Sequence, residues 1–369
     1  MWGLKLAALI VVLGLALTGC QDTGEVENQA YVLVLAIDRA EDGALALTVR
    51  VPRIGSGGSK SDKADSGGSP YLTFSVSAPS WSRALDELQW ATPRRINLSH
   101  IETVVASEEL AAQPSFPELM NAIADTPHLY TNARLVICAG SARAFLEAGE
   151  TVIGARLSSE IRTMLSQYAR QGYIPDACLA EACYCANGIY GDPIAIWAEL
   201  EEYQEGADAS GIMKTPMRQR FSGTALFHGG RFVHALSRAE TRLLGLIRGQ
   251  CATLTYMWRN EAVELSVHSV ASKALVRQED VILSLQAALS APDGLSDADR
   301  SALEASVRGD ILRLISACQR LGVDPFGFAE SAAGHFTTVG QWTAFDWKSH
   351  YVRAAADIDV RILSSHANP

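Results

Sequence analysis

The sequence predicts an α+β protein in which mixed and antiparallel sheets are covered by helices, divided into more than one domain. The chain has 369 residues, of which 48% are hydrophobic and 20% are charged. That length and composition are sufficient for about two hydrophobic cores. Short apolar runs alternate with helical patterns in the first half of the chain, whereas runs of alternating hydrophobicity dominate the second half. These patterns favour layers of sheet and helix over an all-α or all-β fold.

Charge and cysteine content exclude two classes of protein. The formal net charge is −10, whereas a nucleic-acid-binding protein would carry a basic surface. Nucleic acid is therefore not expected as a partner. Seven cysteines in so long a chain do not form the framework of a disulfide-rich scaffold.

Residues 1–19 have the layout of a secretory signal peptide. A lysine precedes an unbroken apolar run over 6–17, which is too short for a comfortable membrane span. The following Leu17-Thr18-Gly19-Cys20 resembles the bacterial lipobox, in which cleavage falls before the cysteine and its sulfur carries a diacylglyceryl group. We therefore expect a lipoprotein signal peptide over 1–19, lipidation at Cys20 and a lipidated tether over 20–30. An uncleaved anchor with an incidental cysteine is the alternative.

Residues 31–200 are expected to form an N-terminal domain of α/β type. The predicted strands are 31–38, 44–53, 71–77, 101–106 and 134–139, and the predicted helices lie after Ser80 and over 116–124, 141–148 and 157–171. The Gly- and Ser-rich stretch 55–69 cannot bury a hydrophobic face and is expected to be a flexible loop. We place this loop inside a hairpin, because 71–77 repeats the alternation of 45–51 and is suited to pair with it.

Residues 217–366 are expected to form a second domain. The stretch 190–215 is rich in Pro, Gly and acidic residues, so we place the domain boundary there, with a linker over 201–216. The predicted strands are 221–228, 231–236, 251–258, 263–272, 281–289 and 357–363, and the predicted helices are 238–248, 296–321 and 324–333. This pattern predicts a mostly antiparallel sheet covered by helices.

Catalytic and cofactor motifs are missing from the sequence. It contains no GxxxxGK[ST] loop, no GxGxxG after a strand, no HExxH and no GxSxG. His228 and His234 flank one predicted turn, where ordinary hairpin residues are favoured over a metal pair. Ser99, His100 and Glu102 lie close together without the context of a nucleophile, so structural hydrogen bonding is favoured. We expect no enzymatic activity, no cofactor and no metal.

Three cysteines lie within eight residues in Cys178-Leu-Ala-Glu-Ala-Cys183-Tyr-Cys185. They could bind zinc, form a disulfide or remain free. A closed zinc site needs a fourth ligand, which the neighbouring sequence does not supply. An extracytoplasmic location would permit Cys178 to pair with Cys183 or Cys185. Free thiols are favoured over both alternatives, and the redox state of the three stays open.

A set of segments in a fixed order spans nearly the whole chain after Cys20. An apolar strand ending in Ile37-Asp38 comes first. The later segments are 83–88, 95–100, 104–110, 134–141, 221–227, 231–233, 236–242 and 322–328, followed by Trp347. Together they resemble the Ger(x)C (GerAC-like) lipoproteins of spore germination receptors. The cysteine cluster and the following 187–190 depart from that pattern.

The resemblance implies a non-enzymatic, membrane-anchored lipoprotein that is the C subunit of a nutrient germinant receptor and is needed for spore germination. It implies A-type and B-type membrane subunits as partners, and a location on the extracytoplasmic face of the membrane, at the outer surface of the spore inner membrane. Cys20 alone carries over as a functional residue. The alternative function is an extracytoplasmic solute-binding lipoprotein, which would show two lobes of similar topology around a hinge cleft.

Overall fold

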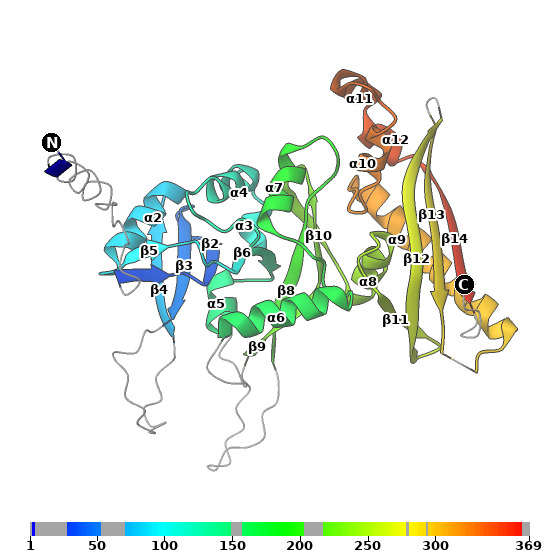
Figure 1. The fold of residues 1–369 in the computed structure, drawn as a ribbon, viewed down its shortest axis with the longest axis horizontal. Coiled ribbons are helices and arrows are strands. Elements are labelled where there is room, and N and C mark those ends of the chain that lie inside the picture. Colours follow the sequence, from blue (N-terminus) through cyan, green and yellow to red (C-terminus); the bar gives the residue numbers. More distant parts are fainter. Residues whose placement is uncertain are drawn as a thin grey trace, which may run out of the picture.

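A computed structural model describes residues 2–3, 28–52, 71–148, 157–202, 217–277, 280–292 and 294–363. It contains two bodies, each built on one principal sheet (Figure 1). We call them the large body, on an eight-stranded sheet, and the small body, on a four-stranded sheet. The α+β fold class expected from the sequence, with mixed and antiparallel sheets covered by helices, is confirmed.

The large body has a sheet of mixed direction. Its strands are β2 (Val34–Arg39), β3 (Leu45–Pro52), β4 (Tyr71–Ala78), β6 (Thr103–Ser107), β7 (Arg134–Cys138), β8 (Ile194–Glu202), β9 (Met217–His228) and β10 (Arg231–Leu236). They lie in the order β10-β9-β8-β7-β6-β2-β3-β4, in which the four central strands β8, β7, β6 and β2 run parallel. A separate short parallel pair joins β1 (Gln29–Tyr31) to β5 (Arg95–Asn97).

Helices cover both faces of the large sheet, which explains why its central strands are apolar on both sides. Along β7, Leu135 and Ile137 belong to one core cluster, whereas Val136 and Cys138 belong to another. The first cluster lies under α2 (Trp81–Trp90), α4 (Phe116–Ala124) and α7 (Leu179–Asn187), with the short α3 (Glu108–Ala111) nearby. The second cluster lies under α5 (Ala142–Glu147) and α6 (Leu157–Arg170).

The small body is a four-stranded sheet with helices packed against it. Its strands are β11 (Thr253–Trp258), β12 (Glu261–Arg277), β13 (Asp280–Ser290) and β14 (Ala355–Leu363), and only the β13–β14 pair is parallel. Its helices are α9 (Asp297–Leu321), α10 (Phe328–Ala333), α11 (Val339–Phe345) and α12 (Trp347–Tyr351). The long helix agrees with its prediction, because Ser296 caps its first turn and Gly322, at φ 67°, ends it.

The expected linker does not separate the two sheets. Strand β8 lies where the sequence suggested a boundary, and it pairs antiparallel with β9 from Ile194↔Leu226 to Glu202↔Met217. Arg218 and Arg220 reinforce the pair by contacting Glu201 across the strands at 2.9 and 3.1 Å. The 217–236 hairpin therefore belongs to the large body, and its assignment to the second sheet was wrong. Three of the acidic residues that suggested a linker, Glu199, Glu201 and Glu202, occupy the partly exposed end of β8.

The hairpin predicted around the Gly- and Ser-rich stretch is confirmed. Strands β3 and β4 pair antiparallel from Leu45↔Ala78 to Pro52↔Tyr71. The stretch 55–69 itself lies outside the described residues, and so does most of the expected linker, over 203–216.

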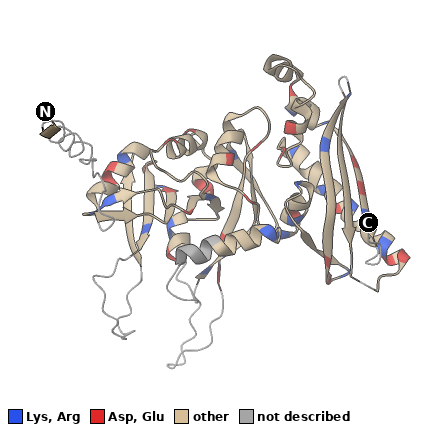
Figure 2. Ribbon diagram, viewed as in Figure 1, with Lys and Arg blue, Asp and Glu red and all other residues tan. Residues whose placement is uncertain are grey.

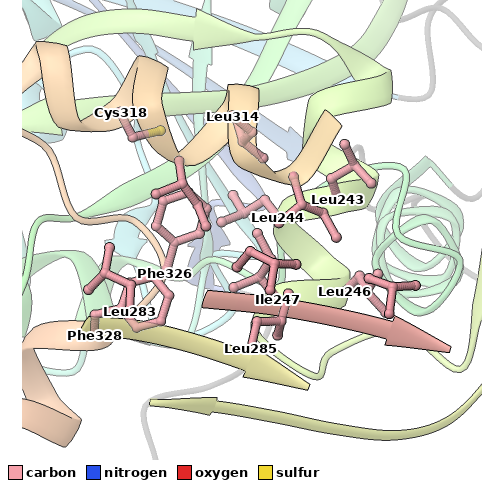
Figure 3. Packing of buried hydrophobic residues seen from close by; sticks show 14 of the residues in the cluster. Leu243, Leu244, Leu246, Ile247, Leu283, Leu285, Leu314, Cys318, Phe326 and Phe328 are labelled. Carbon is pink, nitrogen blue, oxygen red and sulfur yellow. The ribbon is translucent and has the colours of Figure 1, made fainter. Parts of the chain in front are cut away.

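Helix α8 (Arg238–Ile247) joins the cores of the two bodies. It begins with a capping box, in which Ser237 and Glu240 bond each other's backbone N–H groups. Its apolar face packs between the large sheet, strand β13 and α9 (Figure 3). One continuous core cluster thus runs from Leu226 of the large sheet through Leu244 of α8 to Leu283 of β13. The two bodies also differ in topology, unlike the similar lobes of the solute-binding alternative.

Candidate functional site

Besides the core around α8, the two bodies meet through a contact of polar and aromatic side chains. Trp342 of α11 donates its indole N–H to the carbonyl oxygen of Ile189 at 2.9 Å. The Tyr190 ring stacks on the Trp342 ring with centroids 6.0 Å apart. We use the name junction for this contact, which consists of residues 189–192 of the large body with Asp324, α11 and α12 of the small body. It holds segments together that lie more than 130 residues apart in the chain.

A buried carboxylate from the large body lies at the centre of the junction. Asp192 is 7% exposed. Its Oδ1 atom accepts from the Nζ of Lys348 at 3.1 Å, and its Oδ2 atom accepts from the backbone N–H of Asp324 at 3.1 Å. One side chain of the large body therefore binds two separate groups of the small body. Removal of this carboxylate would leave a buried N–H group and a lysine without their partner.

A second buried carboxylate, Asp324, organises the start of α10. It accepts from the backbone N–H groups of Phe326, Phe328 and Ala329 at 3.2, 3.4 and 2.7 Å. Burial raises the pKa of Asp324 to about 6, the backbone N–H groups oppose that rise, and the charge of Asp192 adds to it. The side chain is thus held in place by backbone donors while its ionised form is disfavoured by the loss of water.

A cavity of about 260 Å³ opens at the junction. Its lining includes Asp192, Lys348, Trp342, Trp347 and Tyr351. The buried indole N–H of Trp347 and the buried hydroxyl of Tyr351 have no hydrogen-bond partner among the described residues. The two carboxylates are engaged by donors, and the bonds of Asp192 join the two bodies.

Two further residues, Arg248 and His228, make polar contacts that tie the bodies together next to the cavity. Arg248, which follows α8, contacts Glu181 of α7 and the carbonyl oxygen of Pro325, each at 2.8 Å. His228 donates from Nδ1 to the carbonyl oxygen of Gly322 at 3.1 Å. His228 is therefore a structural residue beside the junction, whereas His234 lies exposed on β10.

The cysteine cluster lies on and before α7, beside the junction. Cys178, Cys183 and Cys185 are free thiols, and Cys185 contributes to the cavity lining. Burial raises the pKa of Cys183 and of Cys185 to about 11 each, which disfavours the thiolate that metal binding and nucleophilic attack require. Within the part of the chain that the structure describes, no group of three or more His, Cys, Asp or Glu side chains is arranged to hold a metal ion.

Ser99 and His100 make structural hydrogen bonds. The Ser99 hydroxyl donates to Oδ1 of Asn97 at 2.6 Å, and the Nδ1 atom of His100 lies 2.9 Å from the same hydroxyl oxygen. Since the serine proton is committed to Asn97, the histidine is not placed to remove it. The His100 ring packs edge-on against Tyr31 with centroids 4.7 Å apart.

The predicted lipidation site, Cys20, lies outside the described residues, so its role stays a prediction. Among the helices of the described ranges, none has both the length and the apolar character needed to cross a bilayer.

Comparison with known families assigns both halves of the chain. A family model described as the spore germination protein N-terminal domain matches residues 22–199, and one described as spore germination B3/GerAC-like, C-terminal, matches residues 222–365. The chain belongs to the GerAC-like family of spore germination proteins. The gap between the two GerAC-like matches runs from the end of β8 to the first half of β9, within the large sheet.

Individual GerAC-like relatives match over most of their length. The chain is 20% identical over 375 residues to the putative spore germination protein YfkR of Bacillus subtilis (strain 168), covering 96% of this chain and 93% of that protein. It shares its fold with the crystal structure of the GerBC protein, with a TM-score of 0.53 and 13% identity, over 90% of this chain and 97% of the GerBC chain.

Two of the segments that carried the GerAC-like resemblance meet at the junction. Asp324 lies within 322–328, and Trp347 lines the cavity. Asp192 and Lys348 were not singled out from the sequence. The available signals were an aspartate between Gly191 and Pro193 directly before an apolar strand, and a lysine directly after Trp347.

Proposed function

We propose that this GerAC-like chain is a non-enzymatic, lipid-anchored subunit of a nutrient germinant receptor and is needed for spore germination. The observation that carries the proposal is the pair of family matches, the first of which begins at residue 22, two positions after the cysteine of the lipobox-like Leu17-Thr18-Gly19-Cys20. The proposed location is the extracytoplasmic face of the membrane, at the outer surface of the spore inner membrane. The proposed partners are an A-type and a B-type membrane subunit.

The proposed anchor is a diacylglyceryl group on Cys20. Each acyl CH₂ buried in a bilayer contributes about 0.8 kcal/mol, and stable attachment takes two chains. A diacylglyceryl cysteine supplies both chains at one residue. Removal of residues 1–19 takes away one positive charge, so the remaining chain has a formal charge of 30 − 41 = −11. The acyl chains would therefore hold the protein at the membrane without help from its overall charge.

Assembly with membrane subunits is consistent with this anchor. A protein confined to the bilayer surface meets other membrane proteins at a high effective concentration, so weak contacts suffice for a complex. A non-enzymatic role is supported by the candidate groups at the junction and around Ser99, which are engaged in structural hydrogen bonds.

The junction cavity raises the alternative of a solute-binding lipoprotein. Such proteins close two lobes over a ligand by a hinge motion, which needs a cleft that opens between the lobes. Here a continuous hydrophobic core through Leu226, Leu244 and Leu283 fills the space between the bodies. The rigid connection therefore favours the receptor-subunit proposal.

The anchor is tested by the Cys20→Ala substitution in the full chain, with Cys178→Ala as the matched control. We expect Cys20→Ala to release the protein from spore membranes and to impair germination, whereas Cys178→Ala retains both properties. The measurements are membrane fractionation, mass spectrometry of the N-terminal peptide and the germination rate. Full membrane retention and normal germination of Cys20→Ala would contradict the anchor.

The receptor assignment has a separate test. A pull-down from detergent-extracted spore membranes is expected to recover a multi-span, transporter-like membrane protein with the wild-type chain. Recovery of the intact lipoprotein alone would contradict its membership in a receptor complex.

A further inference from the structure

One end of the large body displays an exposed tryptophan. Trp90 is the last residue of α2, and its side chain is 87% exposed. Trp81, at the other end of the same helix, is 6% exposed and donates its indole N–H to Thr126. Tryptophan side chains are highly buried on average. An indole that is almost fully exposed on a helix therefore indicates a binding partner outside the fold.

Two arginines follow Trp90, with Arg94 in the loop after α2 and Arg95 at the start of β5. Neither Arg94 nor Arg95 forms an ion pair with a described residue; Arg94 is half-buried and Arg95 is exposed. Gln89 fixes the loop, because its amide donates to the carbonyl oxygen of Arg94 and accepts from the N–H of Ile96, both at 3.0 Å. The guanidinium groups are therefore carried on a backbone tied directly to α2. Such preorganisation lowers the entropy lost on binding.

A tyrosine adds to the same end of the body. Tyr130 is 51% exposed, and its backbone N–H donates to the carbonyl oxygen of Leu98, which directly follows β5. Tryptophan, tyrosine and arginine are the side chains that favour the headgroup region of a bilayer, where rings and alkyl stems contact lipid while polar tips stay hydrated. We call Trp90, Arg94, Arg95 and Tyr130 the aromatic–arginine patch.

The patch lies where the chain arrives from the proposed anchor. Gln29 of β1 pairs in register with Arg95 of β5. Gln29 lies nine positions after Cys20, a stretch that spans at most about 30 Å when fully extended. The elements α2 and β5 form one end of the molecule and the small body forms the other (Figure 1). Acyl chains at Cys20 would bring the α2–β5 end, and not the small body, to the membrane.

We propose that the aromatic–arginine patch docks on the phospholipid bilayer that holds the anchor and so fixes the orientation of the protein. This inference rests on the proposed lipidation of Cys20. Charged residues of both signs are scattered over the molecule (Figure 2), and the tether carries Asp22, Glu25 and Glu27. Insertion of the aromatic rings therefore drives docking, and the arginines contact lipid phosphates. Docking occurs on zwitterionic phosphatidylcholine and needs no anionic lipid.

The test uses the processed, acylated protein in phosphatidylcholine vesicles, with tryptophan emission measured in the presence and absence of lipids brominated near the headgroup. Processing removes Trp2, and Trp90 is the tryptophan with the strongly exposed side chain in the remaining described residues. We expect quenching of the wild-type protein to fall severalfold in Trp90→Phe. It should persist in Trp258→Phe, which removes a half-buried tryptophan from the small body.

A second pair of variants keeps the fluorophore and tests the contact itself. Arg95→Gln is expected to reduce the quenching of Trp90, whereas Arg308→Gln, an exposed arginine on α9, leaves it unchanged. If the protein sediments with vesicles but shows no quenching, the docking surface is overturned and the anchor stays intact. Equal quenching in Trp90→Phe and wild type has the same meaning. Protein that does not sediment and carries no acyl group on Cys20 overturns both proposals.

Discussion

The two ends of the large sheet differ in how far the rest of the chain covers them. At the β10 end, α8 and the small body cover the sheet with a core that includes Leu244, and the buried carboxylate of Asp192 adds polar contacts. At the β4 end, the edge strand is mostly half-buried or exposed, and nearby Trp90 is almost bare. One end is therefore built to be joined within the chain, whereas the other is built to meet an external surface.

The largest expected effect comes from the core at the joined end. Leu244 is 1% exposed, so Leu244→Ala should lower the free energy of unfolding by about 2–5 kcal/mol. Because the same cluster contains residues of both sheets, we expect one cooperative unfolding transition in urea, followed by circular dichroism and by fluorescence. Trp90→Ala at the bare end should stay within about 0.5 kcal/mol of wild type. Two separate transitions, with only one of them shifted, would show that the bodies fold independently.

The pH dependence of the junction gives the next largest effect. Folding raises the pKa of Asp324 from 3.8 to about 6, so the folded state binds this proton more tightly than the unfolded state. The contribution of Asp324 to stability is therefore full below its unfolded pKa and falls as the pH rises through its folded pKa. The upper bound of the loss is about 3 kcal/mol, from 1.36 kcal/mol per pKa unit.

The Asp324→Asn variant isolates this contribution. An amide accepts fewer hydrogen bonds than a carboxylate, so we expect lower stability overall but a flatter dependence on pH across the range from about 4 to about 6. Urea midpoints measured through that range provide the comparison. Asp359→Asn, on the surface of β14, should keep the wild-type slope. An unchanged slope in Asp324→Asn would mean that Asp324 does not hold the raised pKa.

Local patterns were sufficient to predict most of the fold. Alternation identified the β3–β4 hairpin, and spacings of three and four identified α9. Strand β8 was missed, because its Pro, Gly and acidic flanks were given more weight than the alternating Ile194-Ala-Ile-Trp-Ala198 run. The short helices α11 and α12 were also missed. They carry Trp342, which bonds the carbonyl oxygen of Ile189 in the distant segment 189–192, and Trp347, whose ring stacks on that of Trp342.

The junction could not be predicted from the sequence for a related reason. Asp192 and Asp324 are 132 residues apart, and either one alone reads as an ordinary polar residue in a turn. The packing of α8 between the two sheets and the contact of Trp342 with Ile189 bring them together. The exposure of Trp90 could not be predicted from the sequence either, because Trp81 belongs to the same helix and is buried.

The smallest expected effect tests whether the hydroxyl of Tyr351 contributes to the joined end. Tyr351 is 1% exposed and its hydroxyl has no partner among the described residues, whereas the hydroxyl of Tyr256 lies 2.8 Å from Ser306 Oγ and also bonds Asp310. Tyr351→Phe should therefore leave stability unchanged or raise it by up to about 1 kcal/mol, while Tyr256→Phe should lower it by about 1.5–3 kcal/mol. Urea unfolding of the two variants gives the comparison. Equal losses would mean that the Tyr351 hydroxyl is satisfied in solution by water in the junction cavity.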